Sequence, residues 1–135
     1  MSDVHVAKVA SIQRSVKRAR EEFSAAGARF AQDLTRQDAA VLNVLRACES
    51  AIDLANTLIR ERQIGVPPSN RDSFRLLAEA GVIPEDLATR LQKMVGFRNV
   101  AVHRYRDLDV DILTSVIRTN LDDLLRFTEL IAGLG

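Results

Sequence analysis

The chain has 135 residues, of which 47% are hydrophobic and 27% are charged, an ordinary balance for one folded domain spanning residues 1–135. Its formal net charge is only +1, so bulk electrostatics do not indicate a nucleic-acid-binding protein, and such a role would need a local concentration of positive charge. Tryptophan is absent, tyrosine occurs once, and there are only three prolines and six glycines, which argues against a β-sandwich or barrel and favours helices.

Cys48 is the single cysteine of the chain. It excludes an intramolecular disulfide and a cysteine-rich metal site. No apolar run approaches the roughly 20 residues that a membrane-spanning helix needs, and the N-terminal segment lacks the continuous apolar core of a signal peptide. We therefore expect a cytoplasmic protein without a membrane segment.

Hydrophobic spacing predicts two long helices in the first half of the chain. The first covers about residues 4–23. Residues 27–33 are expected to form a connection with a partial turn. The second helix covers about residues 35–63, with Asp33 or Thr35 as its cap. At 100° per residue, Glu49, Asp53 and Asn56 fall together beside its apolar stripe, where polar groups need partners.

Glycine and proline residues that end helices divide the second half of the chain. The sequence Gly-Val-Pro-Pro-Ser-Asn at 65–70 ends the long helix, and a short helix follows through residue 80, with Gly81 as its stop. A fourth helix begins at Pro84 and ends near His103, and Asp107 or Asp109 caps a fifth that continues to about residue 131. We expect an all-α fold: an antiparallel bundle of about four principal helices with the short helix as a connector.

The residues that could carry chemistry lie at the end of the fourth helix, where His103 is accompanied by Arg98, Arg104, Tyr105 and Arg106. A histidine can take a proton from a ribose 2′-hydroxyl or give one to a leaving oxygen. An arginine can hold a phosphate and stabilise the charge that builds during its transfer. This pattern fits RNA cleavage without a metal or other cofactor. A histidine in that position can also simply cap the helix carbonyls.

The segment Arg-Asn-Val-Ala-Val-His-Arg-Tyr at 98–105 resembles the Arg-x4-His-x-Tyr signature of the HepT toxins in the HEPN superfamily of helical ribonucleases. Further stretches resemble that family in the expected order: residues 36–40, 46–56, 65–67, 74–81 and 94–98. The resemblance runs from about Val4 to Leu130.

This resemblance implies particular roles for the motif. Arg98 and His103 match the family's catalytic pair, and Tyr105 matches the tyrosine that a partner antitoxin, a minimal nucleotidyltransferase, modifies with AMP. It also implies a homodimer in which two motifs form one RNA-facing cleft. Since a single chain supplies one of each catalytic residue, a two-fold axis would double both.

Several neighbouring residues are supporting candidates. Glu49 or Asp53 would orient Arg98 or His103 from the facing helix, although pairing with arginines of their own helix is an equal alternative. Asn99 is a further candidate for a supporting role beside the catalytic pair. Arg104 and Arg106 would face the RNA, with solvated surface charge as the alternative.

The expected function is therefore that of an endoribonuclease toxin that acts on RNA and is neutralised by modification of Tyr105. The alternative is a non-catalytic helical module that binds a nucleotide or substrate for a partner nucleotidyltransferase. A helical adaptor whose motif serves only an interface is a third possibility.

Overall fold

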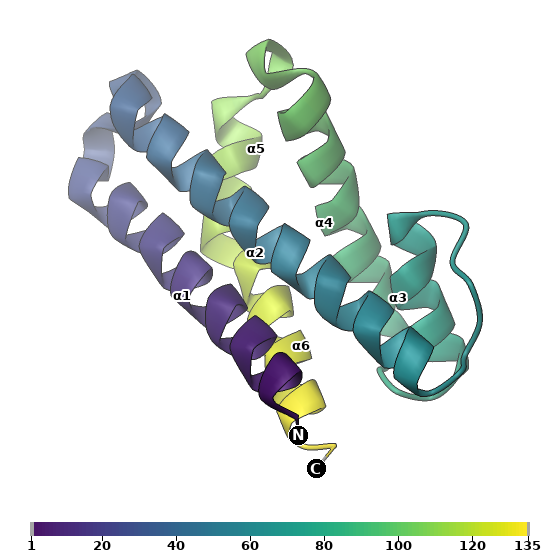
Figure 1. Cartoon of the computed structure of the whole chain (residues 1–135). Helices are drawn as coiled ribbons and strands as arrows, with labels where there is room; N and C mark the ends of the chain where they lie inside the picture. The colour runs from purple at the N-terminus through teal and green to yellow at the C-terminus, as the bar shows by residue number, and fades with distance from the viewer. Residues whose placement is uncertain (1, 135) are drawn as a thin grey trace.

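The computed structural model describes residues 2–134, and all the regular secondary structure in that range is helical. In chain order the elements are α1 (Asp3–Ala26), a 3₁₀ turn (Gly27–Gln32), α2 (Leu34–Glu61), α3 (Asn70–Glu79), α4 (Glu85–His103), a second 3₁₀ turn (Tyr105–Asp107), α5 (Val110–Ser115), a π-helical turn (Val116–Asn120) and α6 (Leu121–Ala132). Helices α1 and α2 lie antiparallel, α3 packs beside α4, and α6 runs behind them (Figure 1). The predicted antiparallel all-α bundle with a short connecting α3 is confirmed.

Capping residues fix where the helices start and stop. Asp33, rather than Thr35, caps α2, because its carboxylate accepts a hydrogen bond from the backbone N–H three residues later. Asp109, rather than Asp107, caps α5 in a similar way. After α3, Gly81 adopts a φ of +77°, a left-handed conformation that suits glycine at a helix stop.

The fifth helix differs from its prediction, because a π-helical turn separates α5 from α6. A π turn shifts the backbone hydrogen bonds by one residue, and here a side chain from another helix meets it. The Nε atom of Arg20 on α1 donates to the carbonyl of Ile117 at 3.2 Å. No glycine or proline marks the turn in the sequence, so hydrophobic spacing alone predicts one uninterrupted helix.

The core gathers around α2, whose apolar stripe is buried from one end of the helix to the other. Phe74 of α3 and Phe127 of α6 also meet there edge to face, with ring centroids 5.6 Å apart. Fully buried leucine and isoleucine side chains fill the remaining space: Ile12, Leu54, Ile59, Leu77, Leu87, Leu91, Leu113, Ile117, Leu121 and Leu124. Burial of this apolar surface is the main source of the fold's stability.

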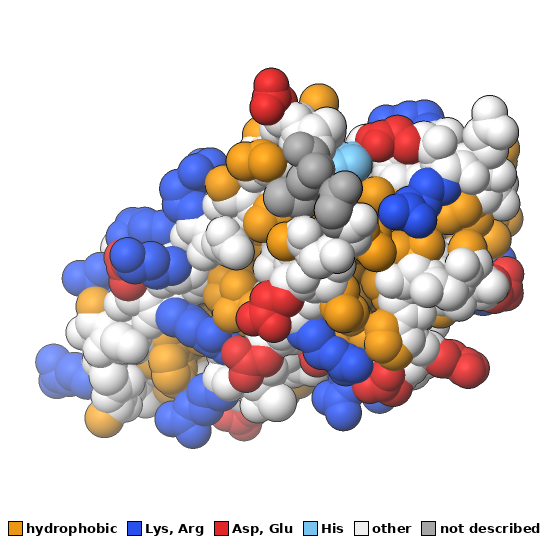
Figure 2. All heavy atoms as spheres, turned by 90° about the horizontal axis from the view of Figure 1, so that it is seen from below, with side chains coloured by type: hydrophobic (Ala, Val, Ile, Leu, Met, Phe, Trp, Pro, Cys, Tyr) orange, Lys and Arg blue, Asp and Glu red, His pale blue; other side chains and the backbone are white. Residues whose placement is uncertain are grey.

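The end of the bundle that carries both termini has a mixed surface. Figure 2 shows acidic and basic side chains among hydrophobic patches there, with Lys and Arg more numerous toward the left of the view. Within residues 2–134, none of the helices is both long and apolar enough to cross a membrane.

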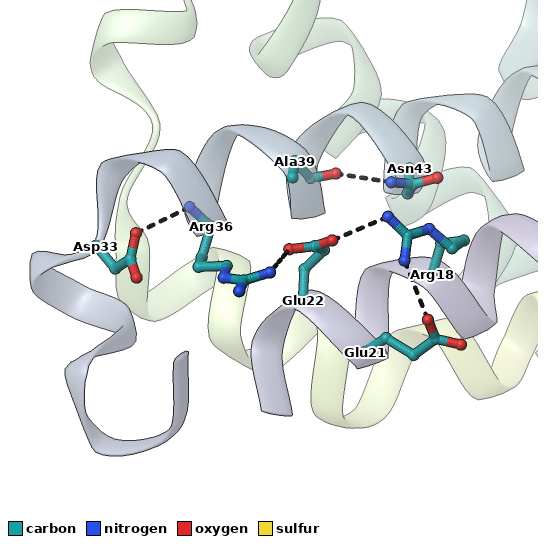
Figure 3. Close-up of polar contacts among 7 residues, drawn as sticks. All are labelled: Arg18, Glu21, Glu22, Asp33, Arg36, Ala39 and Asn43. Atoms are coloured by element: carbon teal, nitrogen blue, oxygen red, sulfur yellow. Dashed lines mark hydrogen bonds and ion pairs between the residues drawn. The ribbon is translucent and has the colours of Figure 1, made fainter. Parts of the chain in front are cut away.

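The first turn of α2 is fixed to α1 by a buried carboxylate, Glu22 (Figure 3). Its two oxygens accept hydrogen bonds from Arg36 of α2 at 2.6 Å and from Arg18 of α1 at 2.9 Å. The hydrogen bond from Arg36 is the largest cause that holds the pKa of Glu22 below its ordinary value. This contact sets the position of the α2 residues that follow.

Replacing this carboxylate tests the contact. Because the pKa of Glu22 is lowered in the folded protein, its stabilising effect is present at neutral pH and is lost as the pH falls through and below the ordinary glutamate range of about 4.3. Glu22→Gln should therefore melt at a lower temperature than the wild type at pH 7, and the difference should shrink toward about pH 3.

Glu21→Gln is the matched control, since Glu21 is exposed and its one ion pair within residues 2–134 is with Arg18. It should change the melting temperature little at either pH. A Glu22→Gln protein with the same pH dependence of melting as the wild type would contradict this assignment.

Candidate active site

Arg98 lies in the last two turns of α4 and is held by two side chains. Its Nε donates to Glu49 of α2, and its Nη1 donates to the side-chain oxygen of Asn99 at 2.9 Å. The Arg98 side chain is only 21% exposed, so its direction is set by these partners. Its three other N–H groups have no partner among the described residues, which leaves them available to an anion.

His103 is the last residue of α4 and is exposed to solvent. Asn99 precedes it by four residues, so the two side chains share one face of the helix. Arg98 precedes it by five, which places the two side chains about 140° apart around the helix axis and about 7.5 Å apart along it. A single chain therefore directs the arginine and the histidine to different sides of α4.

Tyr105 begins the 3₁₀ turn that follows α4, and its hydroxyl donates a hydrogen bond to Asp38 of α2. Partial burial is the largest cause that raises the pKa of Tyr105, and the hydrogen bond to Asp38 and its negative charge add to it, giving about 12. At neutral pH the phenol is therefore protonated. It remains 44% exposed, so other molecules can reach it.

Glu49 and Asp53, the two predicted supporting carboxylates of α2, separate in the structure. Glu49 contacts Arg98, as the facing-helix hypothesis requires. Asp53 contacts Lys8 of α1 at 3.2 Å and is exposed, so its predicted place beside Arg98 or His103 is wrong. Asp53 lies one turn along α2 from Glu49, about 6 Å away along the helix axis, and at that position its partner is Lys8 of α1.

Asn56, the third polar residue of that flank, lies elsewhere as well. Its side-chain oxygen accepts a hydrogen bond of 2.6 Å from Ser73 of α3. This contact satisfies a polar group beside the core and joins α2 to α3.

Arg104 and Arg106 are exposed on either side of Tyr105. Neither side chain forms a hydrogen bond or ion pair within residues 2–134. They therefore place two guanidinium groups near the end of α4 in addition to Arg98, whose charge is paired with Glu49.

A hollow of about 290 Å³ lies between α4 and α5. Val100, which lines it, precedes His103 by three residues, so the hollow borders the side of α4 that carries the histidine and not the side that carries Arg98. Its lining is mainly apolar and includes Phe97, Val100, Leu108 and Ile112. None of the predicted catalytic or modified residues lines it. Arg98 and Tyr105 therefore lie along the surface between α4 and α2, and His103 is exposed on another side of α4.

Sequence reasoning missed Asp38. The residue lies within one of the stretches that resemble the HepT toxins, but its spacing relative to Tyr105 carries no signal. Asp38 and Glu49 are eleven residues apart, which is close to three full turns, so both lie on the same face of α2. That shared face, read beside the motif on α4, is the signal that could have found it.

Comparisons with known proteins identify the family of the chain. The family model described as Ribonuclease HepT-like matches residues 12–131, and the chain belongs to this family. The mRNA nuclease HepT of Shewanella oneidensis is 44% identical over 131 residues, which cover 97% of this chain and 98% of the relative.

Solved structures of toxin–antitoxin complexes contain closely similar chains. One is the tri-AMPylated HEPN toxin of Shewanella oneidensis in complex with the MNT antitoxin, with a TM-score of 0.93, 43% identity, and coverage of 98% of this chain and 99% of that chain. Another is a MntA–HpeT complex in which a tyrosine is replaced by alanine, with a TM-score of 0.91, 43% identity, and coverage of 97% and 99%.

The contact between Glu49 and Arg98 leads to a prediction about RNA cleavage. Glu49→Gln removes the charge that holds the guanidinium, and a misplaced phosphate-binding group should lower kcat by about 10- to 100-fold. The melting temperature should change less, because Glu49 is half exposed and an exposed ion pair adds little to stability.

Asp53→Asn is the matched control on the same helix, and it should cleave RNA like the wild type. Quantified RNA cleavage and thermal melting of both variants are the measurements. Equal kcat values for Glu49→Gln and the wild type would show that Glu49 does not position Arg98.

Proposed function

We propose that this chain is the toxin of a toxin–antitoxin pair, an endoribonuclease that cleaves RNA with Arg98 and His103. The observation that carries the proposal is that the end of α4 presents an exposed histidine and an arginine that is held by Glu49 and Asn99 and keeps N–H groups without a partner among the described residues. Family membership and the 44% identity to an mRNA nuclease support it.

RNA supplies its own nucleophile for this reaction. His103 takes the proton from the 2′-hydroxyl as its oxygen attacks the neighbouring phosphorus, and the 5′-oxygen leaves after it receives a proton from an acid. The free N–H groups of Arg98 bind the phosphate oxygens and stabilise their growing negative charge. The products are a 2′,3′-cyclic phosphate and a 5′-hydroxyl, and this route needs no metal-bound nucleophile.

A homodimer provides the second proton-transfer group. One chain brings a single histidine to its motif, and its arginine points to another side of α4, so a two-fold partner would complete the acid–base pair. Two exposed apolar side chains beside the motif favour such a contact. Leu42 lies one turn after Asp38 on α2 and Val102 one turn after Arg98 on α4, and each is 47% exposed.

Tyr105 is the proposed point of control. A minimal nucleotidyltransferase antitoxin would transfer AMP to its hydroxyl, as the AMP-bearing relative in complex with an MNT antitoxin suggests. The phosphate and the nucleoside would add negative charge and bulk two residues after His103, where they repel and obstruct RNA.

Replacing the histidine tests the activity. His103→Ala removes the group that moves the proton, so RNA cleavage should fall by at least about 100-fold, and the variant should no longer arrest growth when expressed without an antitoxin. The measurements are growth after induction and cleavage of a labelled RNA by the purified proteins.

Arg62→Ala is a suitable control, since Arg62 is exposed at the far end of α2 and should leave both readouts unchanged. If wild type and His103→Ala grow equally and neither cuts RNA, the proposed activity is wrong.

Replacing the tyrosine tests the control step separately. Tyr105→Phe keeps the ring and lacks the acceptor oxygen, so it should still arrest growth while taking up no AMP from the antitoxin. Co-expression and intact mass measurement give both readouts. A Tyr105→Phe protein that is still modified with AMP and neutralised would place the acceptor elsewhere.

A further inference from the structure

The contact between Tyr105 and Asp38 joins two parts of the chain that are 67 residues apart. The phenol comes from the turn after α4, and the carboxylate comes from the second turn of α2. Both residues are exposed, so a second protein and a nucleotide can approach the phenolic oxygen while the carboxylate touches it.

The backbone that carries Asp38 is fixed by contacts at the start of α2. Asp33 caps α2 at the N–H of Arg36, and the Arg36 side chain is fixed to the buried Glu22 of α1 (Figure 3). Asp38 follows Arg36 by two residues, at the start of the next turn of the same helix. The carboxylate therefore meets Tyr105 from a fixed backbone and not from a mobile loop.

Few other charged groups surround the phenol. On its own turn Arg104, Arg106 and Asp107 are exposed, and none forms a hydrogen bond with the Tyr105 hydroxyl. On the facing helix, Asp38 is the carboxylate that touches it. No cation among the described residues is placed to favour the ionised phenolate.

The surroundings make the phenol a poor nucleophile at rest. Burial and Asp38 raise the pKa of Tyr105 to about 12, so almost none of it is ionised at neutral pH. Attack on a phosphate then requires that the proton leaves as the new bond forms, toward a base within hydrogen-bond reach of the oxygen. Asp38 is already in that position.

We propose that Asp38 accepts the phenolic proton when Tyr105 is modified with AMP, so that the toxin itself provides the base for its own inactivation. This inference rests on the proposed modification of Tyr105. The phenolic oxygen bonds to the α-phosphorus of a nucleoside triphosphate, the bond to the bridging oxygen breaks, and pyrophosphate leaves with the electron pair. The proton passes to the Asp38 carboxylate and then to water.

A purely structural role for the contact is the main competitor. A hydrogen bond between exposed groups contributes little to stability, so a simple tether would alter melting only slightly and would not affect the pH dependence of AMP transfer. A base supplied by the antitoxin is the other competitor, and it would also leave the pH dependence unchanged. The pH profile therefore separates the proposal from both.

The experiment measures the initial rate of the first AMP addition to the purified full-length toxin by its antitoxin with ATP. Intact mass spectrometry follows the reaction between pH 7 and pH 9. The toxin variants are Asp38→Asn, which keeps the shape and lacks the base, Asp38→Glu, which keeps the carboxylate, and Asp53→Asn as the matched control on α2. The antitoxin is the same in every reaction, and RNA cleavage and melting are recorded for each unmodified variant.

Asp38→Asn should slow AMP transfer by about 100-fold at pH 7, and its rate should climb by about tenfold per pH unit as the phenol ionises. The rates of AMP transfer to the wild type and to Asp53→Asn should depend much less on pH than the rate for Asp38→Asn. Asp38→Glu should recover most of the rate.

An Asp38→Asn protein that is modified at the wild-type rate with the wild-type pH profile would overturn the proposal. So would an equal loss of RNA cleavage and AMP transfer, since Asp38 would then support the whole turn and not the transfer. If the wild type takes up no AMP at all, the proposed modification of Tyr105 fails first, and that outcome is distinct from the other two.

Discussion

Helix α2 packs its apolar stripe into the core against α1 and presents a polar edge to α4, and the positions of the motif residues depend on that packing. Two carboxylates on this edge, Glu49 and Asp38, contact Arg98 and Tyr105 respectively. Because they lie about three turns apart on one rigid helix, the separation between the two ends of the motif is fixed by α2 as much as by α4. Packing in the core therefore stabilises the fold, while the polar edge of α2 positions the side chains of the site.

The stability and the chemistry of this protein consequently come from different interactions. Buried leucine, isoleucine and phenylalanine side chains hold the helices together, and most ion pairs on the surface add little to them. Glu22 is an exception among the charged residues, since it is buried and joins α1 to the first turn of α2. By fixing the first turn of α2, Glu22 holds the backbone that leads to Asp38, from the side of the helix that faces α1.

Most of the fold can be predicted from the spacing of hydrophobic residues and from the residues that end helices. The apolar stripe of α2, the break around Gly65 and the stop at Gly81 are local signals, and each predicts its element well. The π turn is not visible in that way, because the contact that accompanies it comes from Arg20, almost a hundred residues away. For the same reason projection onto a helix placed Asp53 beside Glu49 but could not tell which neighbouring helix each would face. The motif from Arg98 to Tyr105 was recognisable as a local pattern, whereas its partner Asp38 depends on how two distant helices meet.

The two ends of the described chain lie together. Ser2 and Leu134 line one small hollow with His5 and Glu61, and the turn that carries Tyr105 lies at the other end of the bundle (Figure 1). A tag or fused domain at either terminus therefore stays clear of the motif. The same closeness makes the topology suitable for circular permutation, in which these two ends are joined by a short linker and new ends are opened in the exposed loop between α2 and α3. Such a rearranged chain would keep the edge of α2 and the end of α4 intact while changing the order in which they are synthesised.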